Sequence, residues 1–192
     1  MATIAGLFER YEDADRALVQ INELGYGKDD INVIAPENMI KSKLADKGDA
    51  KEDTAKTGAL VGGLAGLLVG VGTILVPGVG PILTAGALAT ALGSTAVGAG
   101  IGAAAGGFRG SLKEMGLPDA DATILEEGVK NGGILVTVIV EGEDHIRRVK
   151  EIMRSSNAVD LESRRNIMER ETKEQYDEIT GIQRDKRSPD QE

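Results

Sequence analysis

The two ends of the chain share a pattern of apolar and polar positions that predicts a strand, a helix and a second strand in each. At the N-terminal end, residues 3–8 form a short apolar run, and residues 30–35 form another that Pro36 closes. Between these runs, residues 12–24 carry apolar side chains at helical spacing. The inward stripe of this predicted helix consists of Ala14, Ala17, Leu18, Ile21 and Leu24.

The C-terminal unit begins with an additional helix, predicted over residues 119–130. Residues 134–140 form the strongest strand of the sequence, and their continuous apolar character is typical of a central strand that is buried on both faces. A helix over residues 143–154 and a last short strand over residues 158–162 complete the unit.

Three further segments differ in charge from these units. Residues 57–108 contain no charged residue in 52 consecutive positions, and 15 of the 52 are glycine. Residues 37–56 mix five lysines with five acids, which predicts a solvated connector. The tail from Ser163 is half charged, and we expect a solvent-exposed helix over residues 164–178 with a disordered end from about Gly181.

Small residues recur at every fourth position of the uncharged segment, first from Gly58 and again from Gly86. This spacing puts them on one face of a helix, where a second backbone can approach closely. The pattern predicts helices over residues 57–76 and 82–108 that pack through a glycine zipper. The predicted packing residues are Gly58, Gly62, Gly66, Gly70, Gly86, Gly98, Gly102 and Gly106.

A short turn of Pro77, Gly78, Gly80 and Pro81 joins the two predicted helices and makes them antiparallel. As a helix, residues 57–76 would span about 30 Å, which matches the hydrocarbon core of a bilayer. Cations flank the hairpin on both sides, as the positive-inside rule expects of a segment that enters a membrane from the cytoplasm. These cations are Lys51, Lys56, Arg109 and Lys113. Alternatively, the hairpin is soluble and buried in an oligomer.

Together the elements predict an α+β fold in which two βαβ units pair their strands in one ferredoxin-like sheet. The glycine-rich helical hairpin splits the sheet in sequence. The helices of both units would cover one face, so the other face needs the hairpin, the extra helix or a second subunit. The first half, connector, hairpin, second half and tail are expected at 2–36, 37–56, 57–110, 111–162 and 163–192.

Composition argues against several classes of function. The chain has no cysteine, which excludes thiol catalysis and disulfides. Its net charge is −9 without a block of lysine and arginine, so we expect no nucleic-acid partner. There is no P-loop, and the loose G-x-G-x-x-A match at 98–103 lies inside a predicted zipper helix. The N-terminus lacks the pattern of a signal peptide.

Few side chains are candidates for chemistry. His145 is the only histidine, and the acids beside it lack metal-ligand spacing, so we expect a surface histidine. Asp119 and Asp121 are expected to act as favourable charge at a helix N-terminus. We therefore predict no catalytic residue, no metal ligand and no cofactor, and we expect a protein that is not an enzyme.

Four motifs resemble one known family. They are Ala5-Gly-Leu-Phe-Glu9, Asp13-Ala-Asp-Arg-Ala-Leu18, Leu24-Gly-Tyr-Gly27 with Asp30-Ile-Asn-Val-Ile34, and Glu127-Gly-Val-Lys-Asn-Gly-Gly-Ile-Leu-Val-Thr-Val138. The chain is similar in these motifs to the bacterial heat-induced general stress protein family (YflT-like domain), over roughly residues 2–162. The glycine-rich segment resembles that of membrane-assigned, stress-induced relatives. The resemblance implies a bacterial stress-response context and supplies no catalytic residues.

These features predict a non-enzymatic general stress protein that assembles with copies of itself, associates with membrane lipid, or both. It would lie at the cytoplasmic face of the inner membrane or, as a soluble oligomer, in the cytoplasm. The alternative is a soluble oligomeric regulatory module that binds an unknown small molecule or dimerises through the open face of its sheet.

Overall fold

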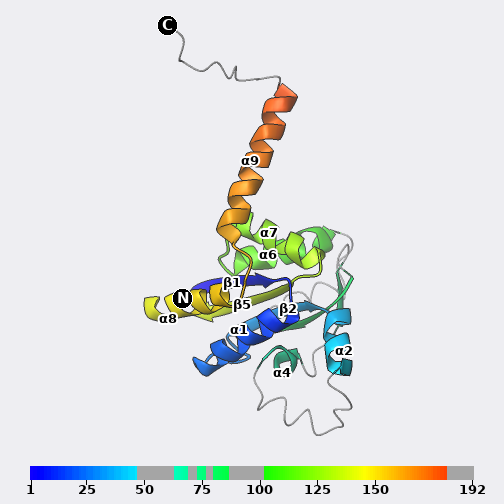
Figure 1. Ribbon diagram of the computed structural model, residues 1–192. Helices are drawn as coiled ribbons and strands as arrows, with labels where there is room; N and C mark the ends of the chain where they lie inside the picture. The colour runs from blue at the N-terminus through cyan, green and yellow to red at the C-terminus, as the bar shows by residue number, and fades with distance from the viewer. Residues whose placement is uncertain (47–62, 69–72, 77–79, 87–101, 181–192) are drawn as a thin grey trace. The chain divides into compact units, whose positions relative to one another are not determined.

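Seven consecutive apolar or β-branched residues, Ile134–Val140, form the central strand β5 of an antiparallel sheet (Figure 1). The computed structural model describes residues 1–46, 63–68, 73–76, 80–86 and 102–180. The strand order is β1-β5-β2-β4-β3, so the fold is α+β, as predicted. The other strands are β1 (Ala2–Phe8), β2 (Ile31–Pro36), β3 (Thr73–Val76) and β4 (Gly80–Ala85).

Seven helices are described, and the chain divides into two units at residues 159 and 160. The first unit holds the sheet with α1 (Tyr11–Glu23), α2 (Glu37–Asp46), α4 (Leu64–Leu68), α6 (Gly102–Glu114), α7 (Asp119–Lys130) and α8 (Glu143–Ser155). The second unit holds the charged helix α9 (Leu161–Thr180), where a solvent-exposed helix was predicted.

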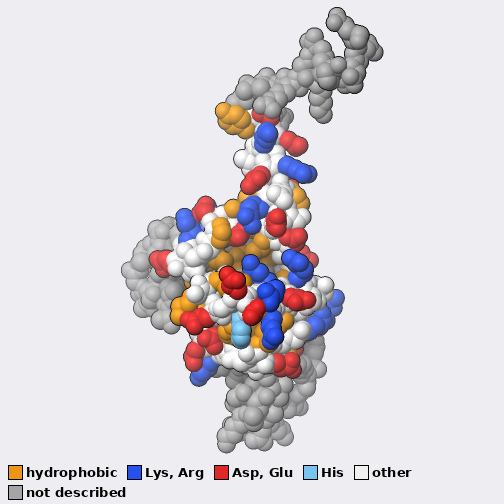
Figure 2. Space-filling model, turned by 90° about the vertical axis from the view of Figure 1, so that its left-hand side faces the viewer, with side chains coloured by type: hydrophobic (Ala, Val, Ile, Leu, Met, Phe, Trp, Pro, Cys, Tyr) orange, Lys and Arg blue, Asp and Glu red, His pale blue; other side chains and the backbone are white. Residues whose placement is uncertain are grey.

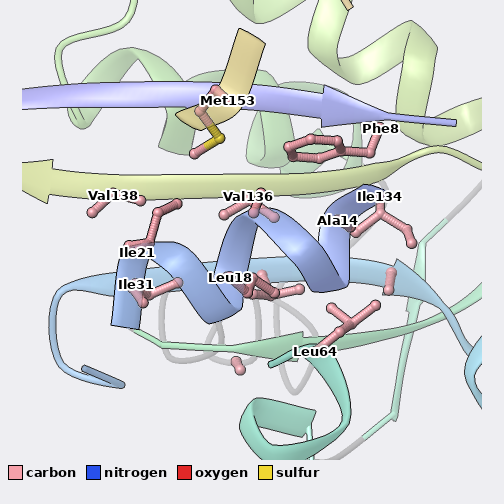
Figure 3. Packing of buried hydrophobic residues seen from close by; sticks show 14 of the residues in the cluster. Phe8, Ala14, Leu18, Ile21, Ile31, Leu64, Ile134, Val136, Val138 and Met153 are labelled. Atoms are coloured by element: carbon pink, nitrogen blue, oxygen red, sulfur yellow. The ribbon is translucent and has the colours of Figure 1, made fainter. Parts of the chain in front are cut away.

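The first face of the sheet packs on α1, α8, α2 and α4. Four of the five residues predicted for the inward stripe of α1 are fully buried, namely Ala14, Ala17, Leu18 and Ile21, and the fifth, Leu24, follows the helix and is partly buried against the same core. In Figure 3 Ala14, Leu18 and Ile21 face alternate residues of β5, including Val136 and Val138. Residues two apart in a strand share a face, which explains why every second residue of β5 enters this cluster.

The second face of the sheet is covered by α7, which packs on β1, β2 and β5, with α6 beside it (Figure 1). A Cβ on Gly128 of α7 would lie only 2.1 Å from Leu7 Cδ2, so the glycine permits the close approach of this helix. Asn32 donates an amide N–H to the Thr137 hydroxyl at 3.1 Å within the same buried layer. Within the described residues, the extra helix α7 is therefore the candidate that packs on this face.

The predicted helical hairpin is wrong at its centre. Thr73–Val76 and Gly80–Ala85 form β3 and β4, an antiparallel pair that extends the sheet from β2. The physical reason is the free edge of β2, since its backbone groups need partners and an uncharged, β-branched segment supplies them. The predicted reversal of the chain is retained, with Gly80 and Pro81 opening β4. Residues 77–79 lie outside the described part.

Gly86 follows β4 and is not on a helix face, contrary to the zipper prediction. Its φ is +85°, and a Cβ there would lie 2.4 Å from the Ile31 carbonyl oxygen and 2.9 Å from Asn32 Cα. The position therefore needs glycine for two reasons, the left-handed backbone and the adjacent strand.

Two boundaries also differ from the sequence prediction. No strand forms over 158–162, because the Asp160 carboxylate accepts the N–H groups of Glu162 and Ser163 at 3.0 and 3.2 Å and so starts α9. Val159 still donates its N–H to the Leu7 carbonyl at 2.8 Å. The connector is also less solvated than expected, since Ile40 of α2 is 1% exposed. Residues 47–56 lie outside the described part.

Substitution of Gly86 tests the packing of β4 on β2. We expect Gly86→Ala to lower the free energy of unfolding by about 1–3 kcal/mol, because the methyl group meets fixed backbone at a strained φ. Gly110→Ala is the matched control, since that position in α6 faces open space and alanine is the better helix former. Urea denaturation of both variants checks this, and equal effects at the two positions would contradict it.

Candidate functional site

The predicted packing residues are distributed over both faces of the sheet. Gly66 lies in α4, which packs on α1, β2 and β4, whereas Gly102 and Gly106 lie one turn apart in α6, which packs on α7. The helical parts of the two segments, α4 and α6, thus lie on opposite faces of the sheet, whereas their strands β3 and β4 pair with each other (Figure 1). Gly58, Gly62, Gly70, Gly98, Pro77 and Gly78 lie outside the described residues.

The candidate site is therefore the uncharged segment as it joins the sheet, and it has two polar anchors. The first is Asp15 of α1, whose carboxylate accepts the N–H of Leu64 at 2.8 Å. The preceding Gly63 has a φ of +120°, and a Cβ there would lie 2.6 Å from the same carboxylate. Leu64 and Leu68 are buried in the first-face core (Figure 3). This arrangement fixes the start of α4 to α1.

The second anchor is Glu37, at the start of α2. Its carboxylate accepts the Thr73 hydroxyl at 2.9 Å and lies 2.7 Å from the Lys41 ammonium. Hydrogen bonds from Lys41, and then from Thr73, lower the pKa of Glu37 below its ordinary value of 4.5. The ionised carboxylate therefore ties the first residue of β3 to α2.

Beyond these anchors, the hairpin presents an apolar tip. Leu75 is 76% exposed, and its register partner Pro81 is exposed beside it. On the face shown in Figure 2, by contrast, acidic and basic side chains are interspersed. A single exposed apolar side chain is common on protein surfaces, so it is the position of Leu75 on the last described strand of the sheet that makes it a candidate contact.

His145 makes one contact that the sequence did not predict. The Tyr26 hydroxyl lies 2.8 Å from its Nδ1, and the two rings meet edge to face. Burial, and then the negative charges of Asp30 and Glu141, raise the pKa of Tyr26. No local sequence pattern predicts this contact, because Tyr26 and His145 belong to opposite halves of the chain. The pair joins the loop before β2 to α8.

Asp119 and Asp121 lie in the first turn of α7, as predicted for favourable charge at a helix N-terminus. The Asp119 carboxylate also binds Arg109 and Lys113 of α6. Hydrogen bonds from Arg109 and then Lys113 lower the pKa of Asp119 below its ordinary value of 3.8. Two cations that the sequence suggested as membrane flanks are thus engaged within the fold.

The described residues offer little else for chemistry. Among them, no three histidine, aspartate or glutamate side chains gather closely enough to hold a metal ion. Within the same part of the chain, no helix combines the length and the apolar character needed to cross a bilayer. No family model, curated protein or solved structure matches the sequence or the fold.

Removal of the Asp15 carboxylate tests the first anchor. We expect Asp15→Ala to lower the free energy of unfolding by about 1 kcal/mol and to speed amide exchange in α4, because the Leu64 N–H loses its acceptor. Asp15→Asn keeps an acceptor oxygen and should lose less. Hydrogen exchange with mass spectrometry checks this, and unchanged exchange in α4 of Asp15→Ala would rule out the anchor.

Acid titration tests the link between α6 and α7. Because the pKa of Asp119 is lowered in the folded state, its ionised form adds stability above pH 3.8, and this is lost as pH falls through the lowered pKa. The difference in unfolding free energy between wild type and Asp119→Asn should stay constant from pH 6 to about 4.5 and shrink below it. Urea denaturation across this range checks the slope. A difference independent of pH would show that the carboxylate charge is irrelevant.

Proposed function

We propose that the protein is a non-enzymatic assembly protein of the bacterial stress response, whose copies associate through the uncharged segment 57–108. One observation carries this proposal. The segment extends the sheet with a hairpin and leaves Leu75 76% exposed, in a chain whose net charge is −9. Like-charged copies repel one another over most of their surface, so an uncharged apolar tip is the favoured place for contact. The stress-response context rests on the motif resemblance alone.

The strand order supports a ferredoxin-like core for this assembly protein. β1 and β2 flank β5, which runs antiparallel to both, and α1 and α8 pack on the same face. The bond from the Val159 N–H to the Leu7 carbonyl lies on the outer edge of β1, where a fourth strand would pair. The β3–β4 hairpin is then an addition at the opposite edge, beyond β2.

Two observations weigh against the other candidate functions. A regulatory module that dimerises through an open sheet face is disfavoured, because α7 packs on the face left by α1 and α8. A permanently inserted helix over residues 57–76 would withdraw Leu64 and Leu68 from the core and would break the pairing of β3 with β4. Both considerations favour association between copies of the folded chain.

Fractionation and sizing of the full chain test the proposal. We expect the protein in the soluble fraction without detergent, with a mean mass that rises with concentration in sedimentation or light-scattering measurements. Retention in carbonate-washed membranes would establish membrane insertion instead. A monomer at every concentration would overturn the proposed assembly.

Leucine substitutions in the same assay test the glycine pattern. If the glycine pattern acts between copies, in addition to the β3–β4 hairpin, Gly62→Leu and Gly102→Leu should weaken assembly while the sheet stays folded, because a large side chain blocks close backbone approach. Gly27→Leu is the control, since that glycine faces open space at a negative φ, and assembly should be unchanged. Normal assembly of both test variants would mean that the glycines serve another purpose.

A further inference from the structure

The two edge strands of the sheet, β1 and β3, differ in what lies beside them. At the β1 edge, the chain itself supplies a partner, since the Val159 N–H binds the Leu7 carbonyl. At the other edge, β3 is the last strand in the described part of the chain. Natural edge strands are commonly protected by lysine, by inward charge or by a bulge. The sequence of β3, Thr-Ile-Leu-Val, contains none of these charges.

The main-chain groups that β3 presents outward follow from the strand register. Ile139 donates its N–H to the Asp30 carbonyl at 2.9 Å, so even-numbered residues of β2 turn toward β5 and odd-numbered ones toward β4. Val33 pairs with Ala85, so odd-numbered residues of β4 turn toward β2 and even-numbered ones toward β3.

The same alternation determines which backbone groups of β3 face outward. Ile82 pairs with Ile74, so the N–H and C=O groups of Ile74 and Val76 turn inward, and those of Thr73 and Leu75 turn outward. The prolines of the sheet agree with this assignment. An N–H at Pro36 would turn toward β5, where the β2–β5 pairing has already ended at Ile34. An N–H at Pro81 would turn toward β2, where the β2–β4 pairing has already ended at Ile82.

We propose that β3 pairs antiparallel with β3 of a second copy, about a two-fold axis at Ile74. This inference rests on the proposed self-assembly and names its surface. In this register Thr73 lies opposite Leu75 of the second copy, and Leu75 lies opposite its Thr73. All four outward N–H and C=O groups of each strand then find partners, and the two sheets become one.

Charge and symmetry both favour a second copy of the chain as the binding partner of the β3 edge. A two-fold pairing is self-complementary, so one strand satisfies both sides of the interface. The contacting strands and the adjoining β4 carry no charge, whereas the chain as a whole carries −9. Two copies that meet edge to edge at β3 therefore bring together strands without charged residues, and the Glu37 carboxylate beside Thr73 is neutralised by Lys41.

Cysteine cross-linking of the full chain tests the register, because the native sequence has no cysteine. Ile74 lies opposite its own copy in a non-hydrogen-bonded pair, where Cα atoms are about 4.5 Å apart, within the range that a disulfide spans. Ile74→Cys should therefore form a covalent dimer under mild oxidation. Leu75→Cys is the matched control. In the proposed register the two Leu75 residues lie diagonally across the strand pair, about 7–8 Å apart, which is beyond the usual reach of a disulfide. Because Leu75 is exposed, the cross-linking rate of this variant measures random collision.

Each outcome decides the proposal, with circular dichroism confirming that both variants are folded. A dimer of Ile74→Cys that forms at least about tenfold faster than that of Leu75→Cys supports the pairing. The reverse order overturns the register. Assembly without cross-linking in either variant overturns the β3 interface while the proposed assembly survives, and a wild-type monomer overturns both.

Leu75→Lys supplies a second test that needs no cysteine. An edge lysine is a natural device against strand pairing, so this variant should associate about tenfold more weakly than wild type in sedimentation experiments. Leu75→Thr keeps a neutral β-former at the same position and should associate like wild type. Equal association of Leu75→Lys and wild type would contradict pairing through β3. A chain that stays monomeric and binds only peptides of other proteins at its β3 edge would also contradict it.

Discussion

The pairing of β5 with β1 and β2 is the interaction on which the rest of the structure depends. Val136 lies opposite Gly6 on one side and opposite Val33 on the other, and it is fully buried. The partners come from opposite ends of the chain, so closing this sheet brings together segments separated by the whole glycine-rich middle. Once β5 is in place between β1 and β2, the middle segment can add strands only at an outer edge.

That constraint explains where the uncharged segment goes. β4 pairs with the outer edge of β2, and β3 pairs with β4. Asp15 and Glu37 hold the segment to α1 and α2 on one face, while α7 covers the other face. Within the described part of the chain, β3 is thus the last strand at this end of the sheet, and it carries no charged residue. The proposed assembly follows from this placement and not from a separate binding pocket.

The sequence predicted the elements whose signals are local. The bounds of α7 and β5 match the predicted 119–130 and 134–140, because α7 has helical spacing and β5 is a short, β-branched run that begins directly after two glycines. The β3–β4 hairpin was missed because a segment without polar positions has no period to separate helix from strand. Its conformation depends on the free edge of β2, a long-range effect. The anchor from Asp15 to Leu64 was missed for the same reason, since neither residue carries a local sign of the other.

Amide hydrogen exchange in Thr73–Val76 at low and high protein concentration tests the central claim most directly. The N–H groups of Ile74 and Val76 turn toward β4 and should be protected at both concentrations. Those of Thr73 and Leu75 turn outward, so their protection should appear only at the concentration where copies associate. Exchange at Thr73 and Leu75 that does not depend on concentration, in a sample whose mass shows assembly, would contradict the account.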